Sequence, residues 1–70
     1  MKKGDHVAWQ WGNGVAEGVV EEVCTERTEI QSRNKKITRN GSSDNPALII
    51  NHASGNKVLK LASEVTKTQL

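Results

Sequence analysis

The sequence contains few of the residues that mark several large classes of protein. It has one cysteine, Cys24, so the chain cannot form an internal disulfide. It has two tryptophans and no tyrosine or phenylalanine. No apolar run approaches the ~20 residues of a membrane-spanning helix, and no apolar segment follows the basic start of the chain as it would in a signal peptide. These absences favour a cytoplasmic protein that does not enter a membrane.

Residue patterns typical of catalytic, metal and nucleotide sites are also missing. Nothing near His6 or His52 in the sequence suggests an acid–base partner, and catalysis requires such a partner. These two histidines and Cys24 lack the close spacing of metal-ligand motifs. The glycines within 12–18 do not match a dinucleotide fingerprint, because their spacing is wrong and a strand is expected to follow them. We therefore predict a protein that is not an enzyme and has no cofactor or metal.

The length and charge of the chain limit the remaining possibilities. Its 70 residues allow one domain with a small core, so 1–70 is treated as a single domain. The formal net charge is +2, but 1–26 carries five acidic and two basic residues, whereas 27–70 carries eight basic and three acidic residues. Such asymmetry indicates either an anionic partner or an acidic strand that pairs with a basic one across a sheet.

Apolar alternation and glycine-rich turns predict about five to six short strands and no long helix. We expect a bulge or sharp bend at Gly18, where the alternation of the second strand is broken. Ser63 is expected to cap one helical turn near Ser63–Val65, and the polar end 66–70 is expected to fray. This pattern is typical of a small, bent, all-β barrel of the SH3-like kind. The expected strands are 6–11, 15–25, 28–31, 35–39, 47–50 and 57–61.

The most apolar run of the chain, 47–50, directly follows a polar turn segment that begins at Asn40 and ends at Pro46. Because this run is apolar on both faces, we expect it to be a central strand. The hairpin of 28–39 is the least apolar part, with only Ile30 and Ile37 as anchors. The predicted core consists of Val7, Trp9, Val20, Val23, Leu48, Ile50, Val58, Leu61 and Val65.

Several segments together resemble a known family. They are Lys-Gly-Asp-His-Val-Ala-Trp at 3–9, Thr-Arg-Asn-Gly-Ser at 38–42, Asp-Asn-Pro-Ala at 44–47 and Gly-Asn-Lys-Val-Leu-Lys at 55–60. Over nearly the whole chain the sequence is similar to the Tudor-like domain of the hypervirulence-associated proteins, found in small bacterial proteins and in fungi. The resemblance implies an SH3-like or Tudor-like barrel, and it implies little about activity.

The sequence departs from Tudor domains that bind methylated lysine or arginine. Those domains surround the cation with several aromatic rings. This chain has only Trp9 and Trp11, which a strand would place on the same side, and two rings cannot enclose a quaternary ammonium group. Relatives often carry an aromatic residue where this chain has Leu48. We therefore do not expect a methyl-reading cage.

Binding is the function class that the sequence favours, and three hypotheses remain open. In the first, the protein binds a protein or peptide, with Trp11 as anchor and Asn40, Asp44 and Asn45 as polar contacts. The alternative roles of these residues are core packing for Trp11 and self-capping of the loop backbone for the other three.

The second hypothesis is binding of a nucleic acid or nucleotide through the basic segments 33–39 and 57–60. The third is a structural module without a ligand, either a monomer or a weak homodimer formed through the edge of the 28–39 hairpin. The basic side chains proposed to contact phosphate are Arg33, Lys35, Lys36, Arg39, Lys57 and Lys60.

Overall fold

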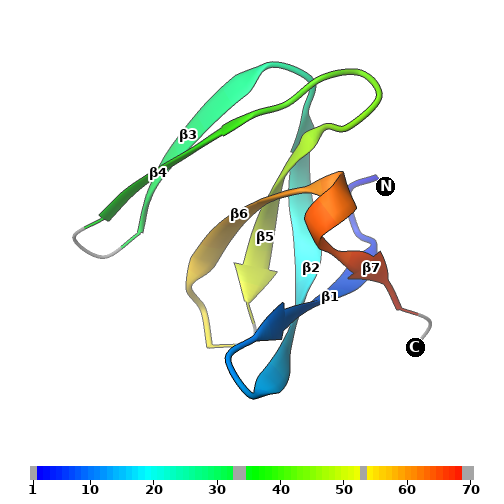
Figure 1. The fold of residues 1–70 in the computed structure, drawn as a ribbon, viewed down its shortest axis with the longest axis vertical. Coiled ribbons are helices and arrows are strands. Elements are labelled where there is room, and N and C mark those ends of the chain that lie inside the picture. Colours follow the sequence, from blue (N-terminus) through cyan, green and yellow to red (C-terminus); the bar gives the residue numbers. More distant parts are fainter. Residues whose placement is uncertain (1, 33–34, 53, 69–70) are drawn as a thin grey trace.

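The computed structural model of the protein describes residues 2–32, 35–52 and 54–68. These residues form seven strands and one 3₁₀ turn, η1 (Figure 1). The small all-β, Tudor-like class expected from the sequence is confirmed. All six expected strands are present with ends within two residues of those predicted, and a seventh short strand was missed. The elements are β1 (His6–Trp11), β2 (Gly14–Cys24), β3 (Arg27–Ser32), β4 (Lys35–Asn40), β5 (Ala47–His52), β6 (Lys57–Leu61), η1 (Ala62–Glu64) and β7 (Thr66–Lys67).

The strands form two sheets. Five of them lie in the order β6–β5–β2–β1–β7, and β3 and β4 form a separate hairpin. Every pairing is antiparallel. Figure 1 shows the hairpin projecting from one end of the larger sheet, on the side of β6, and β6 contacts both of its strands. The hairpin therefore forms a wall beside the edge strand of the main sheet.

The bulge of β2 lies later in the strand than the sequence predicts. The register between β2 and β5 shifts between Val20 and Glu22, and Gly18 keeps regular pairs with both neighbouring strands. The extra residue, Glu21, changes the alternation so that Val20 and Val23, three positions apart, both pack into the core. At Gly18, β2 passes close to β5, because a Cβ atom there would lie 2.6 Å from Ile50 Cγ2. Gly18 therefore allows β2 and β5 to approach each other closely, and it does not form the bulge.

The core predicted from the sequence is confirmed except at Leu61, and it omitted Leu59. The buried cluster contains Val7, Trp9, Val20, Leu48 and Ile50, with Val23, Val58 and Val65 packed against it. Leu61 is only partly buried, whereas Leu59 is almost completely buried. Leu59 pairs with Ile49, on the face of the sheet opposite to Val58. The contact of β6 with the hairpin explains why this second face is buried as well.

The C-terminal segment also differs from its prediction. The helical turn exists, but Leu61 and not Ser63 occupies the capping position, and the Glu64 carboxylate accepts the Leu61 N–H at 2.9 Å. Thr66 and Lys67 do not fray, because they pair with β1, and the Thr68 N–H donates to His6 O at 2.8 Å. Residues 69–70 lie outside the described residues. Within the described ranges no helix has the length and apolarity to cross a membrane.

Candidate binding cleft

A cleft of about 660 Å³ lies between the barrel and the β3–β4 hairpin. One side is formed by residues of β1, β2 and β6, by the end of β5 and by the segment that joins β5 to β6. The other side is formed by β4. Its apolar lining consists of Trp9, Trp11, Ala16, Ile37, Val58 and Leu59. Its basic lining consists of Lys35, Arg39, Lys57 and Lys60.

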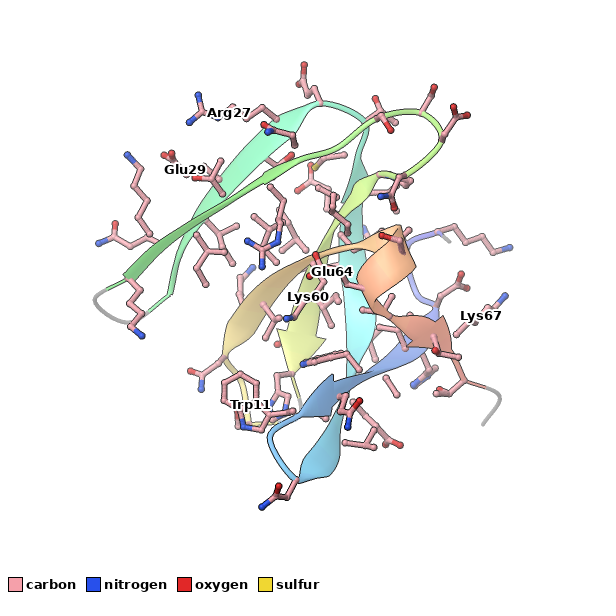
Figure 2. All side chains as sticks on the ribbon, in the orientation of Figure 1. Trp11, Arg27, Glu29, Lys60, Glu64 and Lys67 are labelled. Atoms are coloured by element: carbon pink, nitrogen blue, oxygen red, sulfur yellow. The ribbon has the colours of Figure 1, made fainter. Side chains whose placement is uncertain are left out.

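The two tryptophans of β1 have different roles in this cleft. Trp9 is 5% exposed and belongs to the core, whereas Trp11 is 71% exposed. Strand alternation places both side chains on the same face. The residue opposite Trp11 on β2 is Gly14, which has no side chain to cover the indole ring. Figure 2 shows Trp11 at the end of β1, near the start of β6. Trp9 is thus the floor of the cleft and Trp11 its exposed rim.

The four cations of the cleft differ in their partners. Lys57 Nζ lies 2.6 Å from Glu21 Oε2, and Arg39 Nε lies 3.1 Å from Glu64 Oε1. Among the described residues, no ion pair joins Lys35 or Lys60 to an acidic side chain. The lining contains no aspartate or glutamate in the described part of the chain. The cleft is therefore basic, and among the described residues two of its four positive side chains form no ion pair.

Arg39 and Glu64 connect the hairpin to the 3₁₀ turn. The same carboxylate oxygen of Glu64 accepts from Arg39 Nε and from the Leu61 N–H. Desolvation by burial raises the pKa of Glu64, but the Leu61 hydrogen bond, the Arg39 contact and the more distant Lys60 charge together lower it below its ordinary value. The pair thus holds the basic wall of the cleft against the barrel.

We expect this pair to make stability depend on pH. Because the folded-state pKa of Glu64 is lowered, its contribution is fully present above the ordinary glutamate pKa and is lost as the pH falls through the folded value. Both side chains are 34% exposed, so the contribution is about 0.2–1 kcal/mol. The variant Glu64→Gln should be less stable than wild type at neutral pH by this amount, and equally stable in acid. Urea unfolding at both pH values measures the difference.

Asp5 provides the internal control for that experiment. The backbone N–H of Lys2 lowers the pKa of Asp5, so some acid sensitivity remains in the Glu64→Gln variant. A stability difference between wild type and Glu64→Gln that persists unchanged in acid would show that the loss comes from packing and not from the charge of Glu64.

The polar loop before β5 does not line the cleft, and its Asn45 side chain bonds to the 3₁₀ turn. Asn45 Nδ2 donates to Ser63 Oγ at 3.0 Å, and Asn45 Oδ1 accepts the Ser63 N–H at 2.9 Å. The Asn45 N–H donates to Ser42 Oγ at 3.1 Å. Asn40 and Asp44 are exposed and lie outside the cleft lining. The loop thus caps its own backbone and anchors the 3₁₀ turn.

The structure therefore brings together four of the seven side chains that the sequence suggested for binding. Trp11, Arg39, Lys57 and Lys60 line the cleft, and the three residues of the polar loop do not. Arg33 lies outside the described residues. No group of three described histidine, cysteine, aspartate or glutamate side chains is arranged to hold a metal ion.

Sequence reasoning missed a small polar network in the same cleft. The Ser54 N–H donates to His52 Nδ1 at 3.1 Å, and the Ser54 hydroxyl lies 2.7 Å from the same nitrogen. Asn56 Nδ2 donates to Ser54 Oγ at 3.2 Å. The His52 ring is tilted 60° to Trp9, with the ring centroids 6.0 Å apart. The serine and asparagine of this segment indicate a turn in the sequence, but only the fold places that turn beside the tryptophans.

Comparison with known proteins identifies the family. Residues 4–65 match the family model described as "Hypervirulence associated proteins TUDOR domain". The search found no match among curated proteins and none among solved structures. Tudor-like domains are in general binding modules and not enzymes. Since the match extends from the turn before β1 to the residue before β7, and the fold is of the same kind, the chain belongs to the family of hypervirulence-associated protein TUDOR domains.

Proposed function

We propose that the protein is a binding module that holds a peptide segment of a partner protein in the cleft beside Trp11. The observation that supports this proposal is an indole ring 71% exposed at the rim of an apolar hollow. Tryptophan is among the residues that contribute most to protein interfaces, particularly where it borders a pocket. A ring left open by Gly14 opposite it has room to pack against a ligand.

The composition of the cleft fits a peptide side chain. Its apolar lining includes Trp9, Val58 and Leu59, and Ile37 of the hairpin belongs to the same lining. Small-molecule and peptide sites commonly combine such an apolar surface with a few polar groups that orient the ligand. The His52–Ser54–Asn56 network supplies polar groups of this kind. A peptide with one or two apolar side chains would bury them against this floor.

The charge of the cleft opposes the ligand of methyl-reading Tudor domains. A methylated lysine or arginine keeps its positive charge, and four basic side chains border this site. Only Trp11 presents an accessible ring, because Trp9 is buried. A cage that attracts a cation requires several accessible aromatic faces. The proposed ligand is therefore not a methylated basic side chain.

Replacing Trp11 with alanine is expected to weaken peptide binding by about 30-fold, the effect of losing ~2 kcal/mol at an interface anchor. We would titrate ¹⁵N-labelled protein with a capped peptide that carries a central pair of leucines between polar residues. The indole N–H signal of Trp11 and the amides of β6 should shift together. Chemical-shift titration of the wild type and the variant gives both affinities.

The matched control is Val15→Ala. Val15 is 69% exposed, lies on the same β1–β2 hairpin, and is absent from the cleft lining. This variant should bind as the wild type does. The proposal is wrong if saturating peptide leaves the Trp11 indole signal unmoved, or if both variants bind with the affinity of the wild type.

A further inference from the structure

The basic side chains of the cleft lie around its apolar floor. Lys35 and Arg39 come from β4, and Lys57 and Lys60 come from β6, so cations are present on the two strands that face each other across the cleft. Figure 2 shows Lys60 on β6 and Glu64 in the adjoining 3₁₀ turn, with Trp11 beyond the other end of the strand. A ligand lying along β6 would pass between these charges.

From this arrangement we infer that the segment bound in the cleft is acidic, with carboxylates on both sides of an apolar side chain. The inference rests on the peptide-binding function proposed above. The apolar side chain would pack on Trp11 and Val58, and the flanking carboxylates would pair with Lys35 and Lys60. These two cations are available because no described acidic side chain forms an ion pair with either of them.

The arrangement of charge fits a peptide better than a single-stranded nucleic acid. A nucleic acid requires a continuous row of free cations and several stacking surfaces. Here Lys57 and Arg39 already have carboxylate partners, and Trp11 is the one exposed tryptophan in a chain without tyrosine or phenylalanine. Glu21 and Glu64 lie outside the lining but pair with two of its cations, so their charges would repel a continuous polyanion. A peptide with a few carboxylates can place them at Lys35 and Lys60, which form no ion pair with a described acidic side chain.

The test compares three probes on the full chain. The first is a capped peptide with a central leucine pair flanked on both sides by glutamates, and the second has glutamines in place of the glutamates. The third is a short oligothymidylate. At low ionic strength the glutamate peptide should bind roughly three- to tenfold more tightly than the glutamine peptide, as expected for two exposed ion pairs. Added salt should remove most of this preference, because exposed charges are screened.

A pair of double variants assigns the preference to the cleft. Lys35→Gln with Lys60→Gln should bind both peptides almost equally well. The control, Lys3→Gln with Lys36→Gln, removes the same charge from residues outside the cleft lining and should keep the preference. Lys36 is a suitable match because it adjoins Lys35 on β4 and instead pairs with Glu29 at 3.3 Å.

The outcomes separate this inference from the function on which it rests. Equal binding of the two peptides, with shifts at Trp11, would overturn the acidic ligand and leave the peptide-binding cleft intact. Absence of any shift at Trp11 with either peptide would overturn the proposed function itself. Tighter binding of oligothymidylate than of the glutamate peptide would overturn the inference in favour of a nucleic-acid ligand. Loss of the preference in the control variant would show that it reflects net charge and not the cleft.

Discussion

Replacing Ile50 with alanine is expected to lower the free energy of unfolding by about 2–5 kcal/mol, the usual cost of deleting a large aliphatic side chain from a core. Ile50 is completely buried and belongs to the central cluster. Its Cγ2 atom lies against Gly18, which has no side chain that could move to fill the space left by the deletion. We therefore expect the upper part of that range. Urea unfolding followed by tryptophan fluorescence measures the loss.

The control for Ile50→Ala is Val15→Ala, which also shortens an aliphatic strand residue. Val15 is 69% exposed, so its replacement should change stability by about 0.5 kcal/mol or less. A 70-residue domain has a total stability of roughly 4–10 kcal/mol, so Ile50→Ala removes a large part of it. If that variant is unfolded from the start, Ile50→Val, with an expected loss of about 0.5–1.5 kcal/mol, gives the measurement. Equal losses for Ile50→Ala and Val15→Ala would show that the core is placed wrongly.

The strands and the central core were predictable because alternation along β1 and the apolar run of β5 directly encode burial. Val7 and Trp9 alternate with exposed or partly buried residues on β1, as one buried face requires. The choice between Leu59 and Leu61 was not predictable in the same way. Which of the two leucines is more buried depends on how the β3–β4 hairpin packs against β6. The two apolar residues of the hairpin, Ile30 and Ile37, are not enough to predict that packing from the sequence. The pairing of β7 with β1 uses backbone groups, so its polar side chains gave no signal.

The sequence could predict which types of residue form the candidate site, but it could not predict which individual residues line the cleft. Exposed tryptophan and clustered lysine and arginine suggest binding wherever they occur, and the fold brings Trp11, Arg39 and Lys60 to one cleft. Asn45 was suggested on equal grounds, but its amide is used in two hydrogen bonds to Ser63. A sequence shows which side chains can form hydrogen bonds. It does not show which of those bonds the protein itself will form.

Gly41→Ala is also expected to destabilise the fold, although it adds only one methyl group. A Cβ atom at Gly41 would lie 2.5 Å from Cys24 O, 2.7 Å from Ala47 N and 3.0 Å from Glu26 O. All three are backbone atoms, so no side-chain rotation relieves the overlap. The end of β2, the start of β3 and the start of β5 would have to separate. Forced overpacking of this kind typically costs about 1–3 kcal/mol, and occasionally more.

The position of Gly41 gives this substitution a second expected effect. The Gly41 N–H donates to Glu26 O at 3.2 Å, which joins the two ends of the β3–β4 hairpin where it leaves the main sheet. Displacing that junction moves β4, which supplies Arg39 and Ile37 to the cleft. Gly41→Ala should therefore shift the amide signals of β4 and reduce peptide binding, even under conditions where the protein remains folded.

Gly14→Ala is the matched control for Gly41→Ala. Both variants replace glycine with alanine, so they restrict the unfolded chain equally. Neither glycine has a positive φ, so neither substitution strains the backbone through its φ value. At Gly14 an added Cβ meets only Trp11 O, at 4.0 Å, and the change should be neutral or stabilising by about 0.4–1 kcal/mol. The difference between the two variants in urea unfolding isolates the steric cost at Gly41. If both variants were equally stable, the backbone junction would not be as tight as the structure shows, and the hairpin would not be held by it.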